Sequence, residues 1–122
     1  MKQVVFVDRN GVKLEVGMRV KVQHCIGRYG LTQTVIGRLK RMHEFGSVDV
    51  EPEGHMEPRK SGLPAGACMY PGFKPDEELA RGPLYRGKVV VLRGYHEFHD
   101  VEHGHEKFIE ALPEVDALQV AA

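Results

Sequence analysis

The sequence predicts a mainly β fold, arranged as a small, strongly curved antiparallel barrel. Asn10-Gly11 follows a β-branched run, and this dipeptide best tolerates the two positive φ angles of a tight hairpin. Met18, Val20 and Val22 alternate with polar residues, which is the period of a strand with one buried face. A hairpin, glycines and an alternating strand in so short a stretch favour a barrel.

The first half of the chain supplies most of the predicted strands. They cover residues 3–9, 12–16, 18–23, 33–40 and 47–51. Gly37 lies inside the fourth run, so we expect a bulge or a sharp bend there. A turn near Phe45-Gly46 joins the fourth run to the fifth.

Residues 52–87 have a different composition, with six of the seven prolines and six of the fourteen glycines. Long regular structure is not expected there, and we interpret the segment as an insertion. Pro75 and three acids begin residues 75–82, and Arg81-Gly82 ends them, which predicts a short helix. The large side chains of the insertion either fold back over the barrel or form a contact surface. They are Met56, Leu63, Met69, Tyr70, Phe73, Leu79 and Tyr85.

The C-terminal third contains one clear strand and one ambiguous segment. Residues 88–93 are β-branched, so the barrel strands are expected over 3–51 and 87–95. The spacing of Phe108, Ile109 and Leu112 predicts a second short helix, and a strand over 106–112 is the alternative. Residues 117–120 form an edge strand or a trailing end. With a His-rich extension over 96–122, the whole chain of 122 residues makes one domain.

Turn and strand residues between positions 6 and 51 form a recurring pattern. They are Asp8, Asn10, Gly11, Leu14, Gly17, Val20, Val22, Gly37, Leu39, Val48 and Val50. This pattern resembles the opening of SH3-like small barrels of the KOW and bacterial-accessory type. The chain departs from that pattern at Met18, where many relatives have an acid, and in its long insertion. The resemblance implies a non-catalytic binding module, an accessory protein of a bacterium or phage that contacts nucleic acid or a protein.

The net charge is zero, but the charges are segregated along the chain. Residues 1–43 hold nine Lys/Arg and two Asp/Glu, whereas residues 44–122 hold eight and fifteen. Cations neutralise phosphates and a tyrosine can stack on a base, so we predict a partner-binding surface in the basic half. Its residues are Arg19, Lys21, Arg28, Tyr29, Arg38, Lys40 and Arg41. The alternative is that the two halves neutralise each other in the fold.

Histidines and carboxylates are concentrated between positions 96 and 106. Imidazole and carboxylate are the ligands that Zn²⁺ prefers, so a metal-binding protein or metalloenzyme is the second hypothesis, with Glu97 or Glu106 as base. The candidate ligands are His96, His99, His103 and His105. The spacing matches no established metal motif, and the alternatives are a solvated polar loop and a pH-responsive or partner-contact role. The leading hypothesis therefore includes no cofactor.

The two cysteines and the apolar pattern bear on cysteine catalysis, membrane insertion and cellular location. Cys25 and Cys68 form no CxxC pair and are interpreted as small packed side chains. His24 precedes Cys25, but adjacent strand residues point to opposite faces, which argues against a catalytic pair. No apolar run is long enough for a membrane helix and no leader pattern precedes the first strand, so we expect a cytoplasmic protein. A homodimer formed through a strand edge is a third hypothesis.

Overall fold

The computed structural model describes residues 3–25, 32–59, 62–85, 89–97 and 106–114. These residues are mainly β, as predicted, with one short helix. The elements are β1 (Gln3–Val7), β2 (Arg19–Cys25), β3 (Thr32–Met42), β4 (Val48–Pro52), β5 (Phe73–Pro75), α1 (Glu77–Ala80), β6 (Val89–Glu97) and β7 (Glu106–Ala111). No helix in the described part of the chain is long and apolar enough to cross a membrane.

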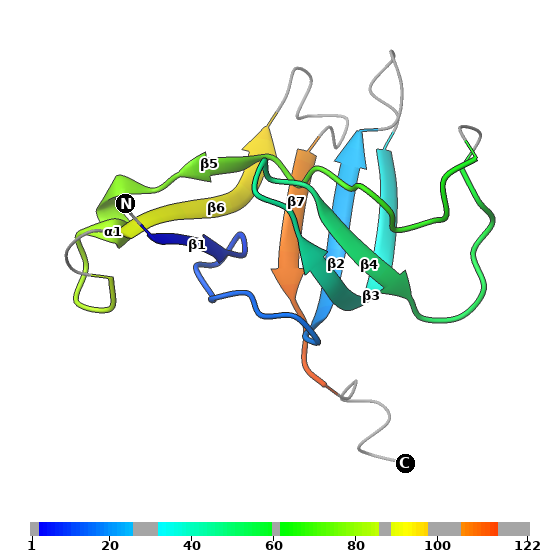
Figure 1. Ribbon diagram of the computed structural model, residues 1–122, viewed down its shortest axis with the longest axis horizontal. Coiled ribbons are helices and arrows are strands. Elements are labelled where there is room, and N and C mark those ends of the chain that lie inside the picture. The colour runs from blue at the N-terminus through cyan, green and yellow to red at the C-terminus, as the bar shows by residue number, and fades with distance from the viewer. Residues whose placement is uncertain (1–2, 26–31, 60–61, 86–88, 98–105, 115–122) are drawn as a thin grey trace.

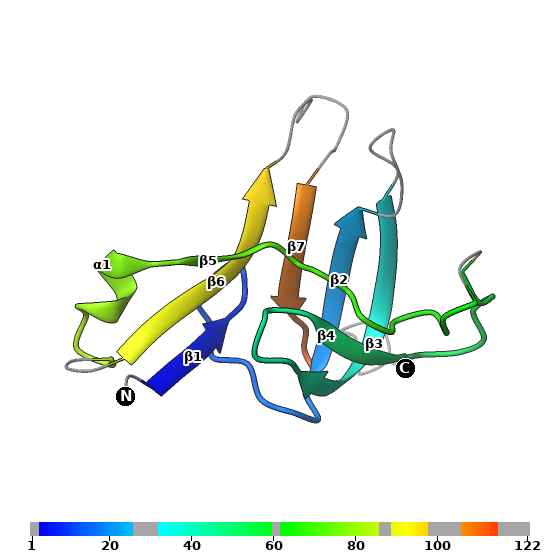
Figure 2. The ribbon, with the colours of Figure 1, turned by 45° about the horizontal axis from the view of Figure 1, so that its top comes forward.

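The strands form one mixed sheet with the path β1-β6-β7-β2-β3-β4, and β5 pairs with β6 off that path (Figure 1). The predicted closure into an antiparallel barrel is wrong in two respects. The ends of the path, β1 and β4, do not pair with each other, so the sheet stays open. In addition, β1 runs parallel to β6, with Gln3 opposite Val89 and Val7 opposite Arg93. Figure 2 shows how strongly the sheet bends between these ends.

The turn at Asn10-Gly11 forms, but without the predicted hairpin of two long strands. Gly11 has φ +87°, whereas Asn10 is not among the residues with positive φ. Residues 12–16 contribute a single bridge, Lys13 to Val7, because β1 takes its main partner from β6. The buried carboxylate of Asp8 closes the turn by accepting the N–H groups of Asn10 at 2.8 Å and Val12 at 2.9 Å.

The antiparallel pairing of β2 with β3 and of β3 with β4 agrees with the predicted strands. The bulge falls between Leu39 and Arg41, not at Gly37. Gly37 is needed for a different reason: a Cβ there would lie 1.9 Å from the carbonyl oxygen of Glu51. The neighbouring strand therefore approaches too closely for any side chain at this position.

The insertion folds back over the sheet at several points. Met69 is fully buried and bridges to Val48, and Phe73 begins β5 on β6. The predicted helix is present but shorter, over Glu77–Ala80, with the Asp76 carboxylate accepting the N–H of Leu79 at 2.9 Å. Leu63 and Tyr70 remain exposed, so only part of the apolar set is tucked in.

The second half contains the predicted strand over 88–93, which extends as β6 to Glu97. The helix expected from the spacing of Phe108, Ile109 and Leu112 is wrong. The alternative, a strand over 106–112, is confirmed as β7, which lies between β2 and β6. Phe108 and Ile109 are both buried although they point to opposite faces, which gave the segment its helix-like spacing. The residues 117–120 lie outside the described part of the structure.

The apolar core divides into two clusters. The larger lies on one face of β2, β3, β4 and β7 and includes Val22, Leu39 and Ile109. The smaller joins β1 to β6 through Val5, Val7 and Val91. The faces that these clusters leave uncovered carry the candidate functional residues.

Candidate partner-binding surface

The alternation of β2 decides which of the candidate cations face outward. Val20, Val22 and His24 are buried, whereas Arg19 and Lys21 occupy the intervening, partly exposed positions. The predicted projection of Arg19 and Lys21 away from Val20 is confirmed. Because β2 pairs with β3 in register, Arg19 lies directly opposite Arg38.

Carboxylates from the acidic half of the chain neutralise this face. Arg19 donates to Glu53 twice, from Nε at 2.5 Å and from Nη2 at 3.0 Å. The hydrogen bond from Arg19 lowers the pKa of Glu53, with further help from the charges of Arg19 and Arg38. Arg38 pairs with Glu114. A bidentate guanidinium–carboxylate pair fixes geometry as well as charge.

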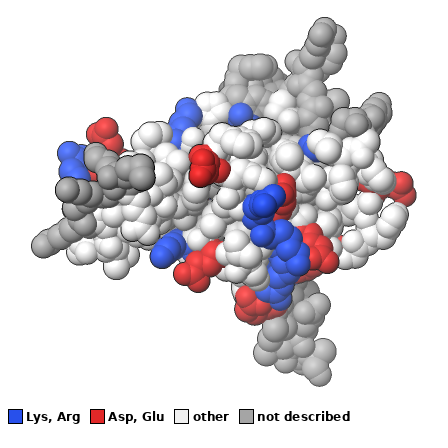
Figure 3. Space-filling model, in the orientation of Figure 1, with Lys and Arg blue, Asp and Glu red and all other residues white. Residues whose placement is uncertain are grey.

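Two more cations on β3 lie beside acids of β4. Lys40 Nζ is 2.6 Å from Glu51 Oε2, and Arg41 pairs in the ladder with Asp49. Burial alone raises the pKa of Asp49, but the hydrogen bonds from the Cys68 N–H and His43, with the charges of His43 and Arg41, lower it overall. On the face that Figure 3 shows, a stripe of basic side chains has acidic side chains beside it. The two predicted contacts Arg28 and Tyr29 lie outside the described residues.

A cluster around Arg9 lies near the β2 cations and was not predicted. The Arg9 guanidinium lies 4.9 Å from the ring centroid of Tyr95 and 4.5 Å from that of Phe108, and its Nη2 lies 3.8 Å from Glu106 Oε2. Stacking of this kind holds a guanidinium flat against aromatic rings. The ladder pairs Tyr95 with Phe108, so the two rings share one face of β6 and β7. The sequence offered no signal for this cluster, because Arg9 is distant from both aromatics along the chain.

Asp8 positions Arg9 on that surface. Its Oδ2 accepts the N–H of Ala111 at 2.8 Å, and the N–H of Arg9 donates to the carbonyl of Ile109 at 2.9 Å. These two bonds tie the first turn to the end of β7. Asp8 was expected only as a turn residue, and its second role requires a partner more than one hundred positions away.

The predicted metal ligands are only partly placed. His96 lies on β6 and packs closely against the insertion. A Cβ added at Gly72 would lie 2.5 Å from the Cβ of His96. His99, His103 and His105 lie outside the described residues, as does the side chain of Glu97. Glu106 accepts the Tyr95 hydroxyl at 3.3 Å and faces Arg9. Within the residues that the structure describes, no three His, Cys, Asp or Glu side chains gather as a metal site would require.

His24 is the one buried histidine of β2. It is 2% exposed, and its Nε2 lies 3.2 Å from the Gln33 amide oxygen. Burial lowers the pKa of His24, partly offset by the Gln33 hydrogen bond and reinforced by the positive charges of Arg59 and Lys107. Cys25 occupies the opposite, less buried face, as the alternation predicted, so the two side chains do not form a nucleophile and base.

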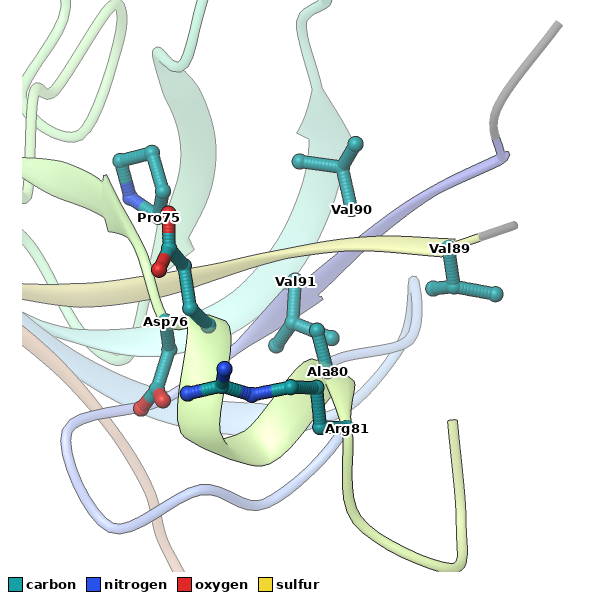
Figure 4. A pocket seen from close by; sticks show the side chains of 8 residues that line it. Pro75, Asp76, Ala80, Arg81, Val89, Val90 and Val91 are labelled. Carbon is teal, nitrogen blue, oxygen red and sulfur yellow. The ribbon is translucent and has the colours of Figure 1, made fainter. Parts of the chain in front are cut away.

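The surface of the described residues includes two hollows with apolar walls. The first, of about 340 Å³, lies between α1 and β6 with Val89, Val91 and Ala80 among its walls (Figure 4). Arg81 and the acids Asp76 and Glu77 also line it, and Asp76 Oδ2 lies 2.7 Å from Arg93 Nη2. The second, of about 450 Å³, is lined by Val4, Phe6, Met42 and Glu44.

No protein-family model, curated protein or solved structure matches this chain.

Proposed function

We propose that this chain is a non-catalytic binding module, of the SH3-like kind that its sequence resembles, and that it binds a protein partner. The observation that carries the proposal is the pairing of the candidate cations. Arg19, Arg38 and Lys40 each already hold a carboxylate of the same chain. A phosphate would have to displace these acids or lie beside them, and like charges about 4 Å apart repel by about 1 kcal/mol even in water.

A charge-paired surface favours recognition of a protein, whose surface offers both signs of charge. Complementary pairs across an interface set its orientation and exclude wrong partners, whereas nucleic acid needs an excess of cations. The antiparallel succession of β2, β3 and β4 supports the proposed relation to SH3-like barrels, which bind through strand edges and loops.

The test is the affinity for a fluorescent single-stranded oligonucleotide, measured by anisotropy over a range of salt concentrations. We expect a dissociation constant no tighter than about 0.1 mM at physiological salt, the weak end of non-specific binding. The variant E51Q/E53Q removes the acids that hold Lys40 and Arg19, so its affinity should rise. Micromolar affinity of the unaltered protein, falling steeply with salt, would contradict the proposal and favour nucleic acid.

A positive test uses the protein as bait in an extract of its own host. We expect a protein to be retained at a salt concentration that abolishes nucleic-acid contacts, because apolar and backbone contacts are not screened. Zinc binding by the His-rich segment remains a separate prediction. Elemental analysis of untagged protein measures it directly.

A further inference from the structure

A hollow separates β1 from the turn that joins β3 to β4. Val4 and Phe6 of β1 form one wall, and Met42 with Glu44 forms the other. Because β1 ends the path of paired strands, this hollow lies at an open end of the sheet. Its volume of about 450 Å³ is enough for a large side chain.

The edge of β1 beside Val4 has no partner in the described part of the chain. The carbonyl of Phe6 accepts the Leu14 N–H at 2.9 Å on the side away from β6. Backbone groups of a strand alternate in direction, so Val4, two residues earlier, turns its N–H and C=O to that same side. No described backbone group bonds to Val4 there. An extended chain lying along this edge would satisfy both groups.

The side chains around the hollow favour an apolar residue next to a cation. Val4 is 47% exposed, and Phe6 rests against Phe73 with ring centroids 4.8 Å apart. At the tip of the β3–β4 turn, Phe45 is 74% exposed. Glu44 also lines the hollow and forms no ion pair with any described residue. The wall therefore combines apolar surface with one uncompensated negative charge.

We propose that an extended segment of a partner protein adds to β1 at Val4, inserting an apolar side chain into the hollow and placing a Lys or Arg beside Glu44. Strand addition obtains affinity from backbone hydrogen bonds and specificity from alternate side chains. The uncharged edge of β1 permits the backbone pairing, and Glu44 selects the sign of the flanking charge. This inference rests on the proposed protein-binding function and names the surface and the chemistry of the bound segment.

The test uses a short synthetic peptide that alternates Val and Lys and a second peptide that alternates Val and Glu. Binding is measured by fluorescence anisotropy, and amide shifts in NMR spectra locate the site. We expect the Val-Lys peptide to bind with a dissociation constant below about 1 mM and to move the Val4 and Phe6 amides. We expect the Val-Glu peptide to bind about tenfold more weakly.

Matched variants separate this surface from the rest of the molecule. Val4→Thr should lower the affinity for the Val-Lys peptide about fivefold. Val16→Thr should leave this affinity unchanged; Val16 is the control because it is also an exposed valine, at 63%. Glu44→Lys should reverse the preference between the two peptides, and Glu15→Lys should leave it unchanged.

Four results would overturn the inference. One is the absence of saturable binding by the Val-Lys peptide, and another is equal effects of Val4→Thr and Val16→Thr. A concentration-dependent dimer that Val4→Thr abolishes would assign the edge to a second copy of this chain. A host protein that the Val4→Thr variant retains at full strength would refute this site while leaving the proposed function intact.

Discussion

Replacing Asp8 with Asn should destabilise the fold, although the two side chains have nearly the same shape. Asp8 is 1% exposed and accepts three backbone N–H groups. Asn retains one oxygen for the N–H groups of Asn10 and Val12, but turns an NH₂ group toward the N–H of Ala111. A charge-assisted hydrogen bond contributes about 1.5–3 kcal/mol, and leaving a buried donor unsatisfied costs about 1–3 kcal/mol. Both contributions describe loss of the same hydrogen bond, so they are not added in full. We expect a loss of about 2–3 kcal/mol in the free energy of unfolding.

Urea denaturation followed by far-UV circular dichroism measures this loss. Glu15→Gln is the control, since Glu15 is exposed and its carboxylate forms no ion pair within the described residues. Hydrogen exchange at the Ala111 amide should become faster in Asp8→Asn alone. If the two variants differ by less than about 0.5 kcal/mol, which is the usual scatter of surface substitutions, the assigned role of Asp8 is wrong.

Two further predictions concern buried positions of β2 and β3. Since burial lowers the folded-state pKa of His24 below 6.5, the unfolded chain binds its proton more readily. The free energy of unfolding should therefore have its full value above about pH 6.5 and decrease as the pH falls through the lowered pKa of His24. Urea denaturation midpoints measured across this pH range should decrease less in the His24→Gln variant than in the unaltered protein. Gly37→Ala should cost at least about 3 kcal/mol, because its Cβ would overlap the Glu51 carbonyl. Gly17→Ala should cost only about 1 kcal/mol, because its φ of +97° is strained for alanine but nothing lies within 4 Å. Equal losses at the two glycines, measured by thermal unfolding, would disprove the argument from close approach.

Local patterns predicted the strands whose two faces differ. In β2, the alternation of Val20 and Val22 with Arg19 and Lys21 was sufficient, because one face is buried and the other is not. The same pattern failed in β7, where neighbours cover both faces. Ile109 belongs to the larger core cluster, while Phe108 lies under the Arg9 guanidinium, so the alternation is lost.

Only part of the candidate partner-binding surface could be predicted from the sequence, for a related reason. The outward direction of Arg19 and Lys21 follows from strand geometry, but the carboxylates that neutralise the basic face come from distant positions. Glu53 reaches Arg19 across 34 positions and Glu114 reaches Arg38 across 76. The segregated charges left two alternatives open, a basic partner-binding surface or neutralisation of the two halves by each other. Ion pairs between residues so far apart have no local signal in the sequence.

The sequence by itself determined the mainly β class, the faces of β2, the positions of β2, β3 and β4 along the chain and the turn at Gly11. Each depends on side-chain period or on the backbone freedom of glycine, which are properties of neighbouring residues. Only the tertiary structure decided that β1 runs parallel to β6, that the sheet stays open, and that Asp8 holds the end of β7. Each of these depends on which strands meet, and that choice is made by apolar burial and hydrogen bonding summed over the whole chain.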